Sequence, residues 1–558
     1  MSPVIPAHAG RLRYSLQALI VSVWVILILI APAGARNAAD ESAGERLYRE
    51  GMLPSSRPLR GYRAGAGSIE GSDAACVHCH RPSGFGSTEG RSVIPPVTAK
   101  YLFHARTRQK DKEDTQHGSA AVPDRSAYTD ATLARAIREG VGPDGRPLDY
   151  LMPRYKLDDA TMASLIAYLK SLSGRRQPGV TDDTMHFATI IAPDSDPVKK
   201  QAMLDVLDHY FAAKNTLYRP RVPLLRGSER VRPRILRKWQ LHVWQLEGNP
   251  ETWKAQLHKR LLTEPVFAVI SGIAGRNWEP VHEFCQEESI PCLLPNVELP
   301  VVKESDFYNV YFSRGVLLEA DLIAQKVREQ VGKSERARII QVYRADDIGA
   351  EASRELCIKV EPVGFRVLNH ALGSGDSIQS QADFLKGAGQ DDVVVFWLRP
   401  KDLKGLPPDV PTRATLYFSG VMGGLENVPL SGGWRVAAQI TYPLELPERR
   451  AVLLNYPLGW FRWQRINLVA ERTQVDTYVA CSILSENLDS MHDDLVRDYL
   501  LERTEDMLSS RLINGFYTRL GLAAGQRFAS KGGYIVRLSE SGRAKVTAEG
   551  DWIVPSLQ

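Results

Sequence analysis

Two cysteines and a histidine within five residues constrain this chain more than any other feature of its sequence. The segment reads Cys76-Val77-His78-Cys79-His80, so two thiols lie three positions apart and an imidazole follows the second thiol. Thiols at this spacing reach the two vinyl groups along one edge of a porphyrin, and the next side chain then lies beneath the iron. The motif therefore predicts one haem c, attached covalently through Cys76 and Cys79, with His80 as an axial ligand of the iron.

Paired cysteines also occur in thioredoxin-like redox sites and in zinc sites. A redox pair would be expected within a strand–helix–strand unit. A zinc site would need a second pair of ligands close by. The sequence around residue 76 has neither feature, so haem attachment is the preferred interpretation.

A methionine 72 positions after His80 is the candidate for the second axial ligand. The Met152-Pro153 dipeptide lies on a predicted loop, just before an amphipathic helix over 158–172. Histidine–methionine ligation is a standard arrangement in c-type cytochromes. We therefore predict that Met152 binds the iron opposite the histidine. The alternatives are Met162, which lies inside the helix, and His104, which would give a bis-histidine site.

The first 35 residues have the pattern of an export signal. Arg11 and Arg13 precede an apolar run of 14 residues, Ala18–Ala31, and small residues follow up to Ala35. A membrane-spanning helix needs about 20 apolar residues, so we expect residues 1–35 to be a signal peptide cleaved after Ala35. A retained anchor is the alternative. Export to the periplasm would place the chain in an oxidising compartment, where thiols can pair.

The hydrophobic pattern changes after residue 183. Residues 174–183 are rich in glycine, proline and polar side chains, which is typical of a linker. Beyond them, short runs rich in valine and isoleucine alternate with amphipathic stretches. The predicted strands and helices lie at 186–192, 197–212, 241–246, 251–262, 265–270, 279–288, 292–294, 309–312, 316–330, 337–343, 350–356, 392–397, 414–418 and 436–440. Such alternation predicts strand–helix–strand units and a mainly parallel sheet.

The alternation occurs in two series, which predicts two lobes. The first lobe covers about 184–312. It also includes a later segment, about 470–525, which contains a helix over 476–484. The second lobe covers about 313–469 and ends with a β-ribbon within about 526–558.

Composition and charge exclude several classes of protein. Of 558 residues, 44% are hydrophobic and 24% are charged, which is ordinary for a globular protein and excludes a mainly disordered chain. The net charge of +5 is too small for a dedicated nucleic-acid-binding protein, so we expect no nucleic acid partner. The segment 219–238 holds eight basic residues and one acid. A solvated loop is the ordinary interpretation of this segment, and the alternative is a contact with an acidic redox partner or a membrane surface.

Residues 40–173 resemble class I cytochrome c. The resemblance rests on the attachment motif, on the Pro95-Pro96 pair and on the Met152-Pro153 loop. It implies an all-α haem domain that carries single electrons. Two axial side chains leave no open position on the iron, so we expect outer-sphere electron transfer and no catalysis at the haem.

Residues 184–558 resemble the type I periplasmic binding proteins, the group of the branched-chain amino-acid receptors. The shared marks are the Ser271-Gly272 turn and the segments 311–314, 343–349 and 478–480. The resemblance implies two α/β lobes on a hinge that close on a small ligand. The loop 273–278 is bulkier and more basic than the small Ser/Thr loop of that group, which argues against an amino-acid ligand.

Ligands of open α/β sheets lie beyond the carboxyl ends of the strands, which gives a set of candidate cleft residues. The candidates in the first lobe are Ser271, Gly272, Arg276, Asn277 and Trp278. Those in the second lobe are Tyr343, Asp346, Asp347 and Ser419. The alternative for three of them is structural: Asn277 and the two aspartates are well placed to cap the helices that follow them.

Four further cysteines could form disulfides in an exported protein, with three possible connectivities. They are Cys285, Cys292, Cys357 and Cys481. The preferred pair is Cys285 with Cys292, because one lies near a helix end and the other on the next strand.

The preferred function is that of an exported c-type cytochrome and not of an enzyme. Its binding-protein-like module would dock a redox partner or sense a small molecule. Its expected partner is a periplasmic dehydrogenase or oxidase, and its module would recognise an unidentified small molecule. The alternative is a solute receptor for transport or sensing, with the haem as a redox or gas switch. An enzyme within the lobes is a third hypothesis, for which the sequence offers no nucleophile–base pair.

Overall fold

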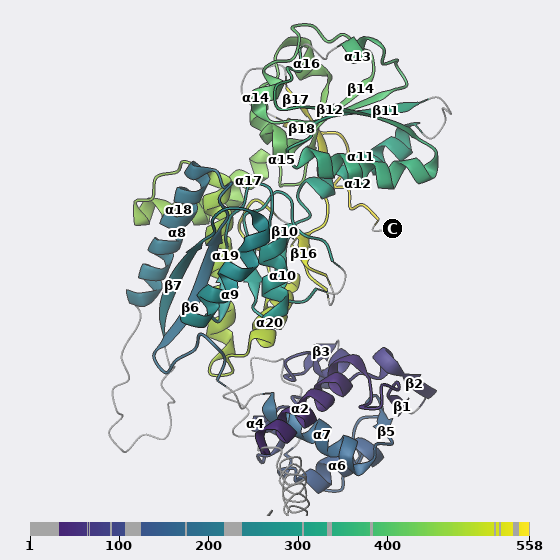
Figure 1. Cartoon of the computed structure of the whole chain (residues 1–558), viewed down its shortest axis with the longest axis vertical. Helices are drawn as coiled ribbons and strands as arrows, with labels where there is room; N and C mark the ends of the chain where they lie inside the picture. Colours follow the sequence, from purple (N-terminus) through teal and green to yellow (C-terminus); the bar gives the residue numbers. More distant parts are fainter. Residues whose placement is uncertain are drawn as a thin grey trace, which may run out of the picture. The chain divides into compact units, whose positions relative to one another are not determined.

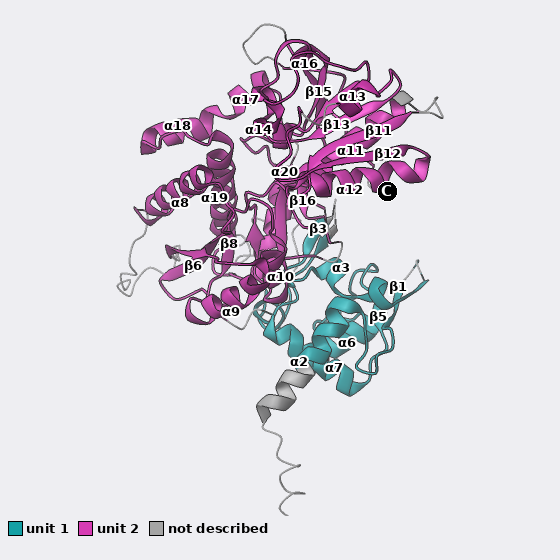
Figure 2. Cartoon of the chain, turned by 45° about the horizontal axis from the view of Figure 1, so that its top comes forward, with its two compact units in different colours: residues 1–175 teal, residues 176–558 magenta. Residues whose placement is uncertain are grey.

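The computed structural model describes residues 33–556, except for 64, 66, 90–91, 107–123, 173–175, 217–236, 304–305, 332–336, 380–382, 518–519, 524–525 and 540–545. The chain divides into two compact units, residues 1–175 and 176–558 (Figure 2). Most of the predicted signal peptide lies outside the described residues. Within the described part, none of the helices combines the length and the apolarity needed to cross a membrane.

The first unit is built mainly from helices. They are α2 (Ala33–Glu50), α3 (Val77–His80), α4 (Ala99–Leu102), α6 (Asp130–Glu139) and α7 (Asp159–Ser171), with the 3₁₀ turn η1 (Gly71–Ala74). Two small antiparallel sheets are added to them: β2 (Gly67–Glu70), β1 (Arg60–Arg63) and β5 (Arg154–Tyr155) form one, and β3 (Ser87–Glu89) and β4 (Ser92–Ile94) the other. The predicted helical fold of this unit is confirmed, with these short strands as an addition.

The longest helices of this unit, α2 and α7, pack closely against each other. A Cβ at Gly44 of α2 would lie 2.2 Å from the carbonyl oxygen of Ser164 in α7, so only glycine allows this approach. Around the contact lies one apolar cluster that includes Leu47, Leu133 and Leu165. The core of the unit is therefore continuous from its first helix to its last.

Helix capping fixes the loop between α6 and α7. Thr129 caps α6 through a reciprocal pair of hydrogen bonds with Thr132, and the helix ends at Gly140 in a left-handed conformation. The side chain of Asp158 accepts the backbone N–H of Thr161 and caps α7. Both ends of the loop that carries Met152 are thus held by local hydrogen bonds.

The first lobe of the second unit contains a six-stranded parallel sheet (Figure 1). Its order is β16 (Phe528–Ser530), β10 (Asn309–Ser313), β9 (Cys292–Leu293), β8 (Ala268–Ile270), β6 (Thr184–Ile191) and β7 (Lys238–Gln245). Its helices are α8 (Pro197–Thr216), α9 (Trp253–Thr263) after the turn η2 (Pro250–Thr252), α10 (Glu279–Glu287), α19 (Glu471–Met491) and α20 (Arg497–Ser510).

The second lobe contains a seven-stranded sheet. Five parallel strands, β12 (Arg366–Leu372), β11 (Arg338–Arg344), β13 (Val393–Trp397), β14 (Thr415–Phe418) and β15 (Ala438–Tyr442), are followed by the antiparallel pair β17 (Tyr534–Leu538) and β18 (Val546–Ala548). The accompanying helices are α11 (Val316–Val331), α12 (Gly349–Val360), α13 (Asp383–Lys386), α14 (Pro400–Leu403), α15 (Gly420–Gly423) and α16 (Gly432–Ala437), with the turns η3 (Glu361–Val363) and η4 (Leu425–Asn427). The prediction of a two-lobed α/β module with mainly parallel sheets is confirmed.

The chain passes between the lobes near residues 314, 447–455 and 531. Two segments that we expected in the second lobe lie with the first. Helix α18 (Asn455–Gln464) packs on α8 and α19 through contacts of Trp460 with Tyr210 and Tyr478, and β16 pairs with β10. The second unit also begins at Arg176, within the segment 174–183 that we interpreted as a linker.

Candidate functional site

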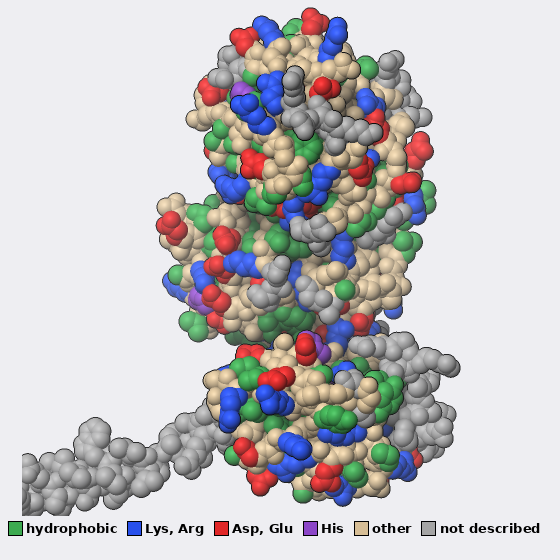
Figure 3. Space-filling model, turned by 90° about the vertical axis from the view of Figure 1, so that its right-hand side faces the viewer, with side chains coloured by type: hydrophobic (Ala, Val, Ile, Leu, Met, Phe, Trp, Pro, Cys, Tyr) green, Lys and Arg blue, Asp and Glu red, His purple; other side chains and the backbone are tan. Residues whose placement is uncertain are grey.

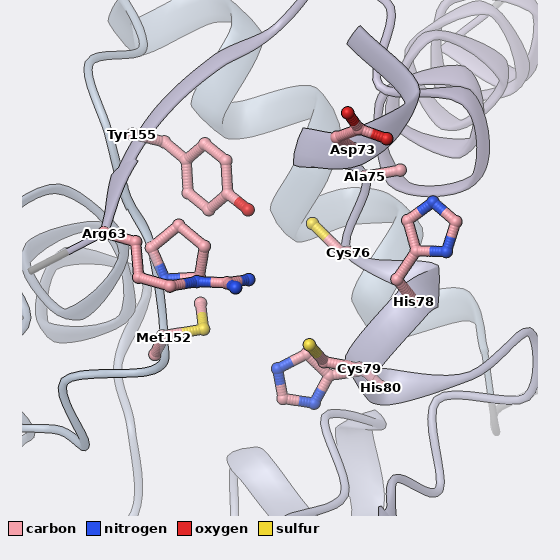
Figure 4. A pocket seen from close by; sticks show the side chains of 10 residues that line it. Arg63, Asp73, Ala75, Cys76, His78, Cys79, His80, Met152 and Tyr155 are labelled. Carbon is pink, nitrogen blue, oxygen red and sulfur yellow. The ribbon is translucent and has the colours of Figure 1, made fainter. Parts of the chain in front are cut away.

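A pocket in the first unit brings together all four residues of the predicted haem site. Cys76, Cys79, His80 and Met152 line it, together with Arg63, Asp73, Ala75, His78, Pro153 and Tyr155. Figure 4 shows the cysteines and His80 on α3 and the turn before it, facing Met152 from the opposite side. The thiols, the imidazole and the thioether therefore converge on one space from two separate segments of the chain.

The ring of His80 is oriented by a hydrogen bond to the backbone. Its Nδ1 lies 3.1 Å from the carbonyl oxygen of Pro95, and because a carbonyl oxygen can only accept, Nδ1 carries the proton. Burial lowers the pKa of His80 to about 4, although the Pro95 carbonyl acts in the opposite direction. The imidazole is therefore neutral at pH 7, and its Nε2 keeps a lone pair for a metal.

The loop between α6 and α7 holds Met152 through Arg154. The guanidinium of Arg154 donates to the carbonyl oxygen of Met152, and it lies 3.4 Å from the carbonyl oxygens of Leu148 and Asp149. The backbone N–H of Met152 also donates to Asp149, at 3.2 Å. These bonds fix the backbone from which the thioether reaches the pocket.

The two thiols lie in an apolar environment. Burial, followed by the nearby Cys79, raises the pKa of Cys76 to about 12. The hydroxyl of Tyr155 donates to the carbonyl oxygen of Ala74 at 2.8 Å, directly before the cysteine pair. Neither cysteine forms a disulfide within the described part of the chain. Burial therefore holds the Cys76 thiol in its neutral form, which disfavours metal binding, because a cysteine that binds a metal must be a thiolate.

The pocket also contains a cation that fits the charge of a haem. The Nε of Arg63 is buried and has no hydrogen-bond partner among the described residues. Figure 4 shows its guanidinium between Tyr155 and Met152, directed into the pocket. A haem carries two carboxylates, and a guanidinium would pair with one of them. The donor set and this unpaired cation together fit a haem c.

The alternative axial ligands lie elsewhere. Met162 is 2% exposed and belongs to the apolar core of the unit, on the buried face of α7. His104 is exposed. Neither residue is part of the pocket lining.

In the second unit, the candidate residues of the first lobe are largely engaged with their own lobe. Ser271 is fully buried; its Oγ accepts from the amide of Asn296 at 2.8 Å and lies 3.2 Å from the hydroxyl of Thr477. A Cβ at Gly272 would lie 2.8 Å from the ring of Trp278, which is itself 1% exposed. These three predicted residues form packing and hydrogen-bonding contacts.

The remaining two candidates of the first lobe are Asn277 and Arg276, of which Arg276 contacts the second lobe. The side chain of Asn277 accepts the backbone N–H of Glu279, the first residue of α10, at 3.1 Å, but the N-cap position itself is Trp278 and has no side-chain cap. Arg276 donates to the backbone oxygen of Asp346 at 2.7 Å, so two predicted cleft residues from different lobes meet.

A cluster of ion pairs connects the lobes at residues that the sequence did not single out. Glu298, on the loop after β9, lies 3.1 Å from the ammonium of Lys199 and 2.6 Å from the guanidinium of Arg399. Arg399 follows β13 in the second lobe and also pairs with the predicted residue Asp347, at 2.8 Å. Burial alone would raise the pKa of Glu298, but Lys199 and Arg399 outweigh it and lower the pKa to about 2.

The last two candidates of the second lobe, Ser419 and Tyr343, form contacts within the core of that lobe. The hydroxyl of Ser419 caps α15 by accepting the backbone N–H of Met422, and it donates to the carboxylate of Glu319. Burial raises the pKa of Glu319 to about 7 although it accepts several hydrogen bonds. Tyr343 packs, partly buried, against the apolar cluster of this lobe.

The expected disulfide between Cys285 and Cys292 is not formed: both residues are free, fully buried thiols within one apolar cluster. Burial, followed by a hydrogen bond with Cys292, raises the pKa of Cys285, which disfavours the thiolate that disulfide exchange requires. Of the basic segment 219–238, all but Arg237 and Lys238 lies outside the described residues. Arg237 lies 3.6 Å from Asp493.

Comparison with known proteins gives a match within the first unit. Residues 70–173 match the family model for cytochrome c. This stretch is therefore similar to cytochrome c, in agreement with the resemblance that the sequence motifs indicated. A search of the curated proteins gave no match.

Solved structures resemble the longer part of the chain. A fatty acid ABC transporter substrate-binding protein from Thermomonospora curvata is 15% identical, covers 68% of this chain and 95% of its own, and superimposes with a TM-score of 0.49. A leucine-binding protein from Thermotoga maritima is 12% identical, with coverages of 66% and 99% and a TM-score of 0.47. A branched-chain amino acid ABC transporter from Thermus thermophilus with bound valine is also 12% identical, with coverages of 68% and 98% and a TM-score of 0.47.

Proposed function

We propose that this chain is an exported c-type cytochrome that carries single electrons by outer-sphere transfer, with its second unit as a ligand-binding or docking module. The observation that carries the proposal is the convergence of Cys76, Cys79, His80 and Met152 on one pocket. A haem bound there would supply reversible one-electron chemistry at its iron. With both axial positions filled by side chains, the site would have no position for a substrate.

Each residue of the pocket has a separate role in this proposal. Cys76 and Cys79 tether the porphyrin, and His80 presents Nε2 because its Nδ1 is held by the Pro95 carbonyl. Met152 supplies the thioether from a loop fixed by Arg154. Thioether ligation and apolar surroundings both favour the reduced iron, so we expect a raised reduction potential.

Spectra of the purified protein test the haem site. The full chain, produced in a host that attaches haem c, should give the pyridine haemochrome spectrum of a doubly attached haem. Cys76→Ser should shift this spectrum to that of a single thioether bond or abolish haem binding, whereas Cys357→Ser, which changes a part-buried thiol of the second unit, should not. A colourless wild-type protein from this host would refute the proposal.

The axial assignment is tested separately. Met152→Ala should remove the weak far-red band of methionine-ligated ferric haem and lower the reduction potential. His104→Ala should leave both unchanged, because His104 is exposed and outside the pocket. A wild-type spectrum without this band, together with a potential that changes in His104→Ala but not in Met152→Ala, would assign the sixth position to His104.

The second unit is proposed to recognise a periplasmic redox partner, either a dehydrogenase or an oxidase, or its small-molecule product. Its candidate cleft residues Arg276, Asp346 and Asp347 are paired within the chain, two of them across the lobes. A ligand would have to displace these pairs, which favours docking over the tight binding of a free solute. A thermal-shift screen with small carboxylic and amino acids checks this: a large stabilisation together with a shift of the haem potential would support the solute receptor instead.

A further inference from the structure

An exposed stripe of apolar side chains runs along the helices α17 (Pro447–Leu453) and α18. The two helices are nearly continuous, because Leu454 between them has helical backbone angles, φ −76° and ψ −10°. Their inner face is formed by residues spaced three or four positions apart, all of which are buried: Arg450, Leu454, Pro457 and Phe461. This face packs on the rest of the second unit and accounts for the helical fold of the segment.

The outer face of these helices is not polar. Val452 and Tyr456 are each 68% exposed, and Trp463 is 75% exposed. They are four and seven positions apart, so they lie on the side of the helix opposite to the buried residues. Leu468 and Val469, 48% and 61% exposed, follow on the next loop. A surface helix normally presents charged and polar side chains on this side.

The charges along the same segment are mainly positive, with exposed Glu448 and Glu471 at its two ends. From Arg449 to Ala470 the sequence contains four arginines and no acid. Arg450 is buried against Glu426, and Arg449 lies 3.8 Å from Glu445. Arg462 and Arg465 are exposed. By contrast, acidic side chains lie among the basic ones on the face of the molecule drawn in Figure 3.

We define the α18 stripe as Val452, Tyr456, Arg462, Trp463, Arg465, Leu468 and Val469, and we propose that it binds the surface of a membrane with anionic headgroups. Tryptophan and tyrosine, with an apolar ring and a polar tip, suit the headgroup region. The aliphatic side chains would reach the acyl boundary, and the two arginines would pair with lipid phosphates. The stripe thus combines burial of apolar side chains with attraction of arginines to anionic lipids, the two contributions on which interfacial binding depends.

The shape of the segment favours lipid over a protein partner. Figure 1 shows α18 at the outer edge of its lobe, beside α8, and the side chains of Tyr456 and Trp463 on this helix are 68% and 75% exposed. A protein partner would need a pocket of matching shape to cover them. A fluid headgroup layer deforms around such side chains and needs only the complementary charge.

Co-sedimentation of the purified full-length protein with lipid vesicles tests the proposal. Binding is expected to vesicles of phosphatidylcholine with phosphatidylglycerol, to weaken with salt, and to be much weaker with phosphatidylcholine alone. Arg462→Gln and Arg465→Gln should each weaken binding about fivefold, since a basic residue near an anionic surface contributes about 1 kcal/mol. Trp463→Ser should weaken it roughly tenfold, from the loss of buried apolar area.

Two controls make the result specific to the stripe. Leu262→Ser changes an apolar side chain that is 84% exposed on α9, and Arg413→Gln removes an exposed charge elsewhere. Both should bind like the wild type, and all variants should keep its urea midpoint. Because every variant has the same N-terminus, a retained anchor cannot produce a difference between them.

Three results would overturn the proposal. The first is that the wild type binds neither kind of vesicle. The second is that the stripe variants bind as well as the wild type, which would place the contact elsewhere, with the basic segment 219–238 as the next candidate. The third is dimerisation that Trp463→Ser abolishes in the absence of vesicle binding, which would assign the stripe to a second copy of the chain.

Discussion

The ion pairs between the lobes make a prediction whose size can be worked out. Replacing Glu298 by glutamine keeps the shape of the side chain and removes its charge beside Lys199 and Arg399. The pKa of Glu298 is lowered from its ordinary value of 4.5 to about 2. One unit of pKa corresponds to about 1.4 kcal/mol, so Glu298→Gln should lower the free energy of unfolding by about 3 kcal/mol at pH 7. The side chain is only 20% exposed, so solvent screens this contribution little.

The sign of the pH dependence follows from the direction of the shift. A carboxyl group with a lowered pKa stabilises the folded state above its unfolded pKa, and this stabilisation is lost as the pH falls through the folded value. The difference between the wild type and Glu298→Gln should therefore shrink from about 3 kcal/mol at pH 7 to about 1.5 kcal/mol at pH 3.

Urea unfolding followed by tryptophan fluorescence measures this difference in the right part of the chain. Nine of the ten tryptophans lie at residue 239 or beyond, and the tenth is Trp24, so in the folded units the signal comes from the second unit alone. Glu247→Gln, at an exposed glutamate of the same lobe, is the matched control and should cost little. A loss that is equal at pH 7 and pH 3, or a loss no larger than that of the control, would refute the ionic explanation.

Two further predictions concern single side chains. A Cβ at Gly86, where φ is +76°, would lie 2.0 Å from the carbonyl oxygen of Ile94, next to the Pro95 carbonyl that orients the haem histidine. Gly86→Ala should therefore destabilise the first unit by about 2–5 kcal/mol, measured by guanidinium unfolding followed through haem absorption. Gly145→Ala, with the same sign of φ but open space around it, should lose much less, and equal losses would contradict the packing argument. Burial raises the pKa of Asp476 from 3.8 to about 7, so its folded state binds a proton that the unfolded chain has released. Stability should fall as the pH rises from about 4 to 7, and Asp476→Asn should flatten this slope in urea titrations; an unchanged slope would refute the assignment.

The residues that line the candidate haem pocket could be predicted largely from the sequence because their determinants are local. The attachment motif spans five residues, and the Met152-Pro153 loop is recognisable beside its helix. Arg63 was missed. It lies on β1 and reaches the pocket because β1 pairs with β5, directly after the methionine loop. Such a pairing between residues about ninety positions apart leaves no local signal in the sequence.

The fold class of the second unit was also predictable, since buried parallel strands appear as short runs of valine and isoleucine. Strand β12 was missed because it is an edge strand with mostly exposed and half-buried side chains. Strand β16 was missed because it has only three residues. Its position next to β10 depends on a parallel pairing across more than two hundred residues.

The ligand residues were the least predictable part. Ser271 and Ser419 follow buried strands, as cleft residues do, but their hydroxyl groups meet Thr477 and Glu319. These partners lie 206 and 100 positions away in the sequence. A strand-end serine therefore has two very different outcomes, a free hydroxyl in a cleft or a hydrogen bond in a core, and only the tertiary structure distinguishes them.

The acidic groups around the lobe junction also combine into one pH profile for the second unit. Glu298, with its lowered pKa, adds stability as the pH rises from about 2 to 4.5. Asp476, and likewise the buried Glu319, has a pKa raised to about 7 and removes stability as the pH rises from about 4 to 7. Both Glu298 and Asp476 act near the same cation, Arg472, which lies 3.5 Å from Asp476. Since the two effects have opposite signs in adjacent pH ranges, the summed contribution of these three groups to stability has its maximum near pH 4. The two variants distinguish these effects. Glu298→Gln should remove the rise of stability with pH below the maximum, and Asp476→Asn should reduce the fall of stability with pH above it.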